Sequence, residues 1–298
     1  MSVKRFYGQA PLRIDLAGAW TDIPFFSDNF GGKTINAAIN IYAQGSICVD
    51  SDPKTGMVGL EYSLDFPTGS GLGSSGSLNV LYYSLINYKK VMKNFINYDD
   101  RVKIALAAHN IERDLGSECG KQDQFAAVIG GINIYSFSRD KNLFRPIAID
   151  REGFEKRILL VNTGVKHSSS DIISHVVSRF ENGNTKTIES LFYMKDSVIE
   201  MNHALEESRW EDVGVILTKQ FESMKSMSYK TTCYEIENII KIASPYIYGA
   251  KPGGAGGGGC VILFCKDEES KDELKNELKN KYLFYDIELD MEGIKIWT

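Results

Sequence analysis

Residues 67–79 read PTGSGLGSSGSLN and contain GLGSSG, which matches the pattern GxGxxG at residues 71–76. Four glycines and four serines lie within ten residues of this stretch. Glycine readily adopts the positive φ angles that bring backbone N–H groups close to an anion. Apolar side chains then recur at helical spacing from Leu78 to Leu85, so the loop leads into a helix N-terminus. The stretch predicts either a phosphate-binding loop or an ordinary Gly/Ser turn before a helix.

Length, composition and charge favour a globular protein that acts on a small molecule. The chain has 298 residues, of which 43% are hydrophobic, enough for two modest domains or one large one. The net charge is −5 and no long run of like charges occurs, so we expect neither a nucleic-acid partner nor a membrane surface. The N-terminus has no apolar core typical of a signal peptide, which favours a cytoplasmic location.

Cysteine and histidine usage argues against two further classes of protein. The five cysteines are scattered and form no CxxC pair, so a disulfide framework is not expected. The four histidines form no HExxH motif, so the spacing gives no support to a zinc enzyme.

Helical and strand-like segments are mixed without a strict alternation, which predicts an α+β protein with a boundary near residues 155–165. Early apolar runs at residues 12–18, 34–43 and 45–50 are typical of strands, or of strands and one short helix. The spacing of apolar residues predicts helices at residues 77–93, 100–115, 124–131, 168–201, 204–227, 233–243 and 268–281. Further strands are expected at residues 132–137, 158–164, 256–265 and 294–297.

Three common phosphate loops do not fit the glycine-rich stretch. A dinucleotide-binding loop needs an apolar strand directly before its glycines and an acidic residue at the end of the next strand, and neither is present. A P-loop needs a lysine after its last glycine, but none lies between Pro67 and Tyr88. A protein kinase also needs HRD and DFG motifs, which the chain lacks.

Three separated segments together resemble the motifs of the GHMP kinase family. They are APLRIDLAGAWTD at residues 10–22, PTGSGLGSS at residues 67–75 and KPGGAGGGGC at residues 251–260. The resemblance implies a two-domain GHMP kinase fold, with an N-terminal α/β domain that bears the phosphate loop (residues 1–160) and a C-terminal ferredoxin-like domain (residues 161–298). The active site would lie between the two domains.

The resemblance also implies ATP as the phosphate donor, with Mg²⁺ as its ion. Glu112 and Ser75 would hold the metal through oxygen atoms, which Mg²⁺ prefers. Read without the resemblance, Glu112 could belong to a solvated helix face and the third glycine-rich segment could be a hairpin. The expected ATP-binding residues are Pro67, Gly69, Gly71, Leu72, Gly73, Ser74, Ser75, Gly76, Gly254 and Gly256.

The expected catalytic pair is Asp123 and Arg13. Asp123 lies in ECGKQDQFAA, at the position where similar sugar kinases place the aspartate that faces the acceptor hydroxyl, so it would act as general base. Arg13 would lie near that carboxylate and favour its charged form. A purely structural alternative makes Asp123 a helix N-cap and Arg13 part of an interdomain ion pair.

The acceptor is expected to be a sugar or sugar phosphate. Asp22 of the segment AWTD could accept hydrogen bonds from two neighbouring hydroxyls. The segments AWTD, KQDQ and LVNTG resemble the branch of heptose 7-phosphate kinases and fucokinases, although Ala19 replaces a residue that is usually glycine or acidic. Lys166 and His167 stand where that branch suggests an arginine, and would bind a phosphorylated acceptor or form an exposed loop pair.

The resemblance therefore implies an ATP-dependent kinase that phosphorylates an anomeric hydroxyl, best that of a heptose 7-phosphate. The alternatives are a fucokinase- or galactokinase-like enzyme for an unphosphorylated sugar, and a catalytically silent sugar sensor. The oligomeric state is left open, with a homodimer as one alternative.

Overall fold

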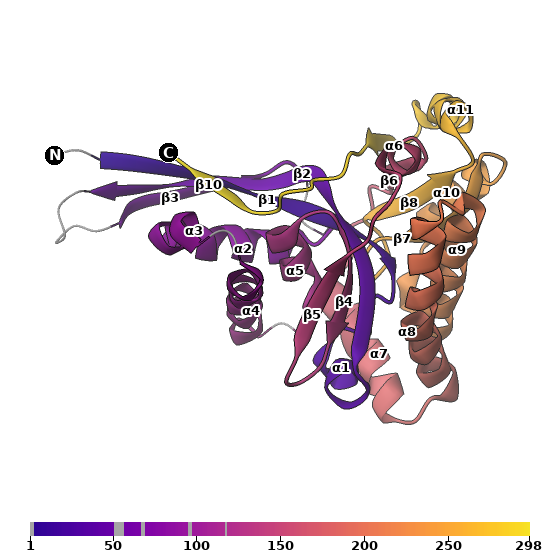
Figure 1. The fold of residues 1–298 in the computed structure, drawn as a ribbon. Coiled ribbons are helices and arrows are strands. Elements are labelled where there is room, and N and C mark those ends of the chain that lie inside the picture. The colour runs from indigo at the N-terminus through magenta and orange to yellow at the C-terminus, as the bar shows by residue number, and fades with distance from the viewer. Residues whose placement is uncertain (1–2, 51–56, 67–68, 95–96, 117) are drawn as a thin grey trace.

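The computed structural model describes residues 3–50, 57–66, 69–94, 97–116 and 118–298. These residues form two antiparallel sheets with helices packed against them (Figure 1). The expected α+β class is therefore confirmed.

The first sheet has six strands in the order β10-β1-β2-β4-β5, and β3 pairs with β2 beside this path. The strands are β1 (Val3–Ala17), β2 (Gly32–Asp50), β3 (Met57–Leu64), β4 (Ile132–Phe137), β5 (Asn142–Pro146) and β10 (Lys295–Trp297).

Alternation along β1 places charged side chains on the side of the functional site. Leu12, Ile14 and Leu16 join one apolar core cluster. Successive side chains of a strand point to opposite faces, so Arg13 and Asp15 face the other way. Both charged residues are nevertheless buried, and buried charges require partners. The second half of β1 thus contributes apolar side chains to the core on one face and carries the buried charged side chains of Arg13 and Asp15 on the other.

Helices cover one side of the first sheet, as Figure 1 shows. Val80, Leu81 and Leu85 of α2 (Ser74–Ile86) pack with Phe125 of α5 (Gln122–Ile129) into a shared core. The helices are α2 (Ser74–Ile86), α3 (Tyr88–Asn94), α4 (Tyr98–Asp114) and α5 (Gln122–Ile129).

The second sheet has the strand order β7-β8-β6-β9. A helical region joins β6 to β7 and one helix joins β8 to β9, which gives the β-α-β-β-α-β connectivity of a ferredoxin-like fold. The strands are β6 (Ile158–Asn162), β7 (Ile247–Pro252), β8 (Cys260–Cys265) and β9 (Leu283–Asp286). The remaining helices are α1 (Pro24–Phe30), α6 (Arg151–Glu155), α7 (Ser169–Glu181), α8 (Thr185–Glu206), α9 (Trp210–Met227), η1 (Tyr229–Thr231), α10 (Tyr234–Ala243) and α11 (Glu268–Leu278).

Three of the expected helices have other boundaries. The stretch at residues 77–93 contains two helices, α2 and α3, which Asn87 separates. The stretch at residues 168–201 is not one helix, because Gly183 adopts φ 71° and Asn184 caps a new helix, α8. That helix then continues into the stretch expected at residues 204–227. Ser208, with φ 54°, lies in the break before α9. These last two breaks fall in polar runs, ENGNTKT at residues 181–187 and EESR at residues 206–209, and such turn residues end helices.

The division of the chain at residue 160 stays a prediction. Residue 160 lies inside β6, a strand of the second sheet. The C-terminal strand β10 returns to the first sheet, where Trp297 lies opposite Tyr7 of β1. The two termini consequently lie at the same end of the molecule in Figure 1.

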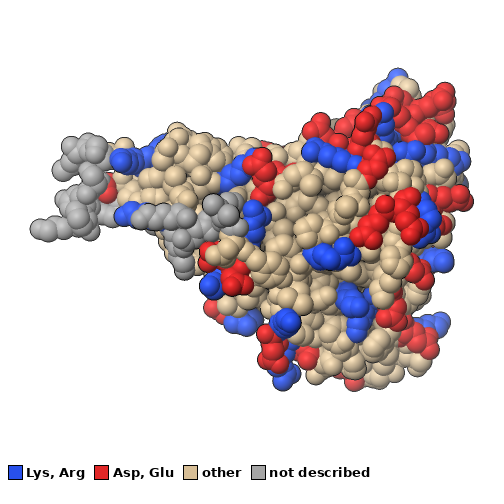
Figure 2. Space-filling model, viewed as in Figure 1, with Lys and Arg blue, Asp and Glu red and all other residues tan. Residues whose placement is uncertain are grey.

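The surface in Figure 2 carries charges of both signs, interspersed over the half that contains α8 to α11. Among the described residues on this face, neither sign forms a dominant field of the kind that steers a polyanion. No helix in the described part of the chain is long and apolar enough to cross a membrane.

Candidate active site

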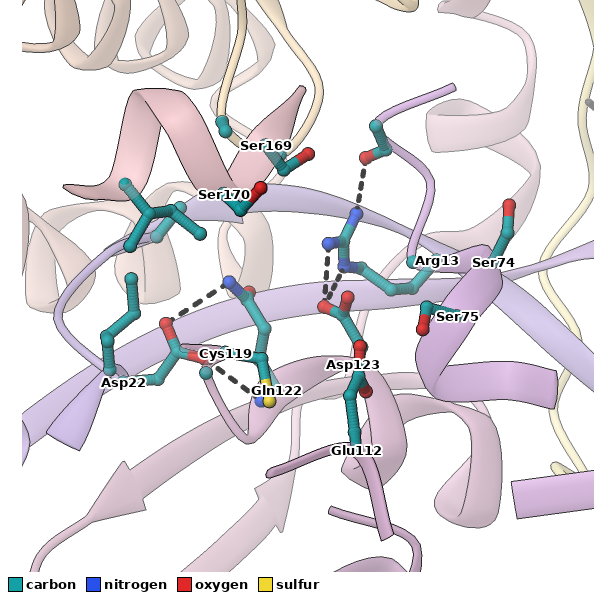
Figure 3. A pocket seen from close by; sticks show the side chains of 18 of the residues that line it. Arg13, Asp22, Ser74, Ser75, Glu112, Cys119, Gln122, Asp123, Ser169 and Ser170 are labelled. Carbon is teal, nitrogen blue, oxygen red and sulfur yellow. Dashed lines mark hydrogen bonds and ion pairs between the residues drawn. The ribbon is translucent and has the colours of Figure 1, made fainter. Parts of the chain in front are cut away.

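A cavity of about 430 Å³ lies where the end of β1, the phosphate loop and the start of α7 meet. Figure 3 shows its labelled side chains converging from these elements and from α4 and the start of α5. The residues that line it are Arg13, Ala19, Trp20, Asp22, Ile23, Gly69, Ser70, Gly71, Gly73, Ser74, Ser75, Leu78, Glu112, Glu118, Cys119, Gly120, Gln122, Asp123, Ser169, Ser170, Ile173, Gly254 and Ala255.

The glycine-rich loop ends at an uncapped helix N-terminus that opens on this cavity. Gly73 is the N-cap residue of α2 in a left-handed conformation, and no side chain caps the helix there. The first N–H groups of a helix have no intrahelical partner, and the helix dipole is positive at this end. Ser74 and Ser75 add hydroxyl groups at the first turn (Figure 3). The loop is thus suited to phosphate oxygens.

Close contact with the third glycine-rich segment explains the loop's glycines. Gly71 has φ 77°, and a Cβ atom there would lie 2.5 Å from the carbonyl oxygen of Gly253. A Cβ on Gly254 would in turn lie 3.0 Å from the carbonyl oxygen of Gly71. A residue larger than glycine at position 71 or 254 would force the two segments apart.

The predicted nucleotide residues fall into two groups. Gly69, Gly71, Gly73, Ser74, Ser75 and Gly254 line the cavity. Leu72, Gly76 and Gly256 do not line it. Leu72 is buried, and Gly76 and Gly256 make close backbone approaches, Gly76 to Asp123 and Gly256 to Thr231. Pro67 and Thr68 lie outside the described residues.

Arg13 and Asp123 form the ion pair expected from the sequence. Arg13 Nε lies 2.8 Å and Nη2 2.6 Å from Asp123 Oδ1, and Nη1 donates to the carbonyl oxygen of Gly71 at 2.7 Å. Burial would lower the pKa of Arg13, but the carboxylates of Asp123 and Asp15 raise it, so Arg13 remains a cation. Asp123 lies in the first turn of α5, and its side chain is 27% exposed. Its free oxygen is available to a ligand in the cavity.

Asp22 lines the same cavity as this pair. Its Oδ2 accepts from the backbone N of Gln122 at 3.0 Å and its Oδ1 from Gln122 Nε2 at 3.3 Å. Burial raises the pKa of Asp22 to about 6. A Cβ at Gly120 would lie 1.9 Å from Asp22 Oδ2, which explains the glycine before the KQDQ segment. Gln122 and Asp123 are consecutive, so one helix turn positions both carboxylates.

Glu112 of α4 provides a second carboxylate close to the phosphate loop. Its Oε2 accepts from Gln124 Nε2 at 2.7 Å, and the nearby Ser75 side chain favours its charged form. Burial raises the pKa of Glu112. Figure 3 shows Glu112, Ser75 and Asp123 near one another.

These oxygen donors fit a magnesium ion that a nucleotide holds in part. Mg²⁺ is usually bound by one or two carboxylates together with substrate phosphates and water. Within the described ranges no cluster of three or more His, Cys, Asp or Glu side chains could hold a metal by itself. Glu112 and Ser75 suit a shared site rather than a closed protein site.

Lys166 and His167 do not line the cavity. They lie in the loop between β6 and α7, where Lys166 is exposed and His167 half-buried. His167 Nε2 lies 3.3 Å from Ser169 Oγ, and burial lowers the pKa of His167. Instead, Ser169 and Ser170, the first residues of the helix α7 that follows this loop, line the cavity.

The sequence reasoning missed several residues of this site. Ser169 and Ser170 line the cavity and face it across from the Arg13–Asp123 pair (Figure 3). The run of three serines at residues 168–170 could have indicated a helix N-terminus, because serine is a preferred N-cap residue. Ser168 does cap α7, and its Oγ accepts from Asp171 N at 3.4 Å. Cys119 also lines the cavity, but burial raises the pKa of its thiol, so it is not a ready nucleophile.

A second hollow of about 210 Å³ lies beside the first and shares Leu78 with it. It is mostly apolar, and two tyrosines at its rim, Tyr62 and Tyr82, are exposed. Its lining residues are Leu60, Tyr62, Leu78, Asn79, Leu81, Tyr82 and Leu85.

The fold and the site together define a two-domain phosphotransferase: an anion-binding helix N-terminus faces an arginine-paired carboxylate. Two family models match the chain, the GHMP kinases N terminal domain at residues 34–131 and the GHMP kinases C terminal domain at residues 201–283. The chain belongs to the GHMP kinase family, whose members use ATP as phosphate donor.

Three relatives show the range of the similarity. A D-glycero-alpha-D-manno-heptose 7-phosphate kinase of Campylobacter jejuni is 29% identical, over 99% of each chain. An L-fucokinase/L-fucose-1-P guanylyltransferase of Bacteroides fragilis is 24% identical, over 91% of this chain and 36% of the relative. The structure of Lactococcus lactis galactokinase with galactose has a TM-score of 0.73 and 19% identity, over 98% of this chain and 95% of that chain.

Proposed function

We propose that this protein is an ATP-dependent kinase that phosphorylates the anomeric hydroxyl, at C1, of a manno-configured heptose 7-phosphate. The observation that carries the proposal is the convergence of two carboxylates, Asp22 and Asp123, on one cavity beside the phosphate loop. The full-length similarity to a heptose 7-phosphate kinase supports the choice of acceptor.

The described side chains support an in-line transfer. Asp123 accepts the proton of the C1 hydroxyl while that oxygen bonds to the γ-phosphorus and the bond from phosphorus to the β–γ bridging oxygen breaks. Arg13 holds the Asp123 carboxylate in place through two N–H groups. The loop N–H groups at the start of α2 bind the phosphates. A magnesium ion held by Glu112 and Ser75 would neutralise phosphate charge.

The second hollow suits the purine of ATP. It adjoins the phosphate loop through Leu78, and leucine and tyrosine side chains offer an apolar surface for a flat base. Tyr62 and Tyr82 provide the aromatic surface at its rim. A single nucleotide can then occupy the loop and this hollow together.

The start of α7 suits the distal phosphate of the acceptor. Ser169 and Ser170 present hydroxyls to the cavity from a helix N-terminus. Lys166, on the preceding loop, supplies an exposed cation for a near-dianionic group. Asp22 would accept hydrogen bonds from ring hydroxyls at the opposite wall.

An unphosphorylated sugar is the second candidate, with a fucokinase- or galactokinase-like activity. The fact that Lys166 and His167 do not line the cavity favours it. No observation favours the catalytically silent sensor, and the ion pair between Arg13 and Asp123 supports the enzyme.

A panel of acceptors tests the proposal directly. ATP consumption is measured with heptose 7-phosphate, free heptose, fucose, galactose and mevalonate, and the product is mapped by phosphorus NMR. We expect heptose 7-phosphate to have the highest kcat/KM and its new phosphate to be on C1. Equal rates with phosphorylated and free heptose, or a preference for fucose, would contradict the proposal.

Substitution of Lys166 tests the phosphate anchor separately. Lys166→Ala should raise KM for heptose 7-phosphate by about fivefold, as expected for an exposed ion pair, and leave KM for free heptose unchanged. Lys279→Ala, an exposed lysine at the end of α11, is the matched control. An equal change for both sugars would place the anchor elsewhere.

A further inference from the structure

The buried ion pair between Asp15 and Lys251 lies next to the site but does not line its cavity. Asp15 is in β1 and Lys251 in β7, and both residues are 0% exposed. Lys251 Nζ pairs with Asp15 Oδ2 and also donates to the backbone carbonyl of Asp15 at 3.1 Å. An ion pair without solvent contact loses its hydration energy, so a structural role alone is a costly reason to keep it.

Asp15 also connects three segments that are far apart in the sequence. Its Oδ1 accepts from the backbone N of Gly254 at 2.8 Å and lies 3.8 Å from Arg13 Nη1. Arg13 in turn donates to the carbonyl oxygen of Gly71 at 2.7 Å. Asp15 thereby links the third glycine-rich segment, the phosphate loop and the arginine that pairs with Asp123.

The charges along this connection alternate in sign. Lys251 is followed by Asp15, then Arg13 and finally Asp123, and each neighbour is an ion-pair partner of the next. Lys251 occupies one oxygen of Asp15, so the other stays directed at the N–H of Gly254. An aspartate without this lysine would be free to turn toward Arg13.

We propose that Asp15, held in orientation by Lys251, is a positioning residue for nucleotide binding: it fixes Gly254 against Gly71 and thereby sets the shape of the phosphate loop. The inference rests on the proposed nucleotide site at that loop. The acceptor half of the cavity, around Asp22, receives no contact from Asp15 or Lys251 in the described part of the chain.

Two double variants isolate the hydrogen bond from the charges. Asp15→Asn with Lys251→Met removes both charges and keeps an oxygen for Gly254 N. Asp15→Leu with Lys251→Met removes both charges and that oxygen as well. Asparagine and leucine both have the branched shape of aspartate, and a buried ion pair can often be replaced by apolar groups of similar volume without loss of stability. Both variants should therefore fold, and the leucine variant should have a somewhat lower melting temperature because it lacks one hydrogen bond.

Affinity for ATP with magnesium is measured by calorimetry in the absence of sugar, so the result does not depend on the acceptor. We expect the asparagine double variant to bind within about threefold of wild type, and the leucine double variant about tenfold more weakly or worse, because Gly254 is then no longer held against Gly71 in the conformation that binds phosphate. KM for the acceptor should change less than the affinity for ATP in both, since Arg13 keeps Asp123 and the carbonyl oxygen of Gly71 as partners. A general loss of folded structure would instead affect both ligands.

Equal ATP affinity in the two double variants, whether high or low, would overturn the assignment. Asp15→Val with Lys251→Met replaces the leucine variant if that protein does not fold. If neither apolar variant folds while the asparagine variant does, the oxygen serves folding and the inference is wrong. Failure of the wild-type protein to bind ATP would overturn the nucleotide site itself, and the wild-type titration distinguishes this result from the others.

Discussion

Replacement of Asp123 by asparagine should abolish most of the turnover while nucleotide binding is kept. Asparagine has the shape of aspartate and retains Oδ1, the atom to which Arg13 Nε and Nη2 donate at 2.8 and 2.6 Å. The geometry of the Arg13 side chain should therefore survive. The amide cannot accept the proton of the attacking hydroxyl, so the chemical step loses its base.

The size of the effect follows from this division of roles. Loss of a general base commonly costs on the order of 100- to 10,000-fold in rate, which corresponds to about 2.7 to 5.4 kcal/mol of transition-state stabilisation. The fold should lose only about 1 kcal/mol, because the Asp123 side chain is 27% exposed and Arg13 keeps the carbonyl of Gly71 as an acceptor. Affinity for ATP should not fall, since one negative charge near the phosphates is removed.

The assay measures ADP release at saturating substrates and ATP affinity by calorimetry. Asp99→Asn is the matched control, because Asp99 also lies in the first turn of a helix but is exposed on α4. A variant at position 123 that keeps more than about a tenth of the wild-type rate would refute the assignment of Asp123 as general base. Loss of ATP affinity in the same variant would refute the separation of binding from catalysis.

Glu112→Gln and Ser75→Ala should each raise the magnesium concentration needed for half-maximal rate, because each weakens an oxygen contact to the ion or its waters. Titration of magnesium at fixed ATP measures this concentration. An unchanged magnesium requirement in both variants would contradict the metal site. KM for the acceptor should rise as pH falls through about 6, because Asp22 then gains a proton and loses acceptor capacity, whereas Asp22→Asn should have a high KM that does not change with pH. The raised pKa also means that the contribution of Asp22 to stability is lost as pH rises from its ordinary value of 3.8 through about 6, so Asp22→Asn should raise Tm at pH 7.5. A lower Tm would show that the ionised carboxylate stabilises the fold.

The glycine-rich stretches were readable from sequence because their chemistry is local. Positive φ angles, a helix N-terminus and small side chains require particular residues within a few positions, and Gly71 and Gly73 adopt the conformations that such a loop needs. The α+β class was also predictable, since apolar periodicity reports which side of each element is buried. Helix ends were predicted less well, although the polar runs at residues 181–187 and 206–209 mark the breaks at Gly183 and Ser208.

The sequence, through its glycine-rich stretch and its resemblance to the GHMP kinases, predicted the types of chemistry available, namely an anion-binding loop, a carboxylate with an arginine and an acidic acceptor site. Only the tertiary structure decided which of these groups meet. Arg13 and Asp123 are separated by 110 positions, and Asp15 and Gly254 by 239. Such contacts depend on how β1, α5 and the segment after β7 pack together, and no local pattern encodes that packing. The same packing left Lys166 outside the cavity and brought Ser169 and Ser170 into it, because the α7 N-terminus rather than the preceding loop faces the site.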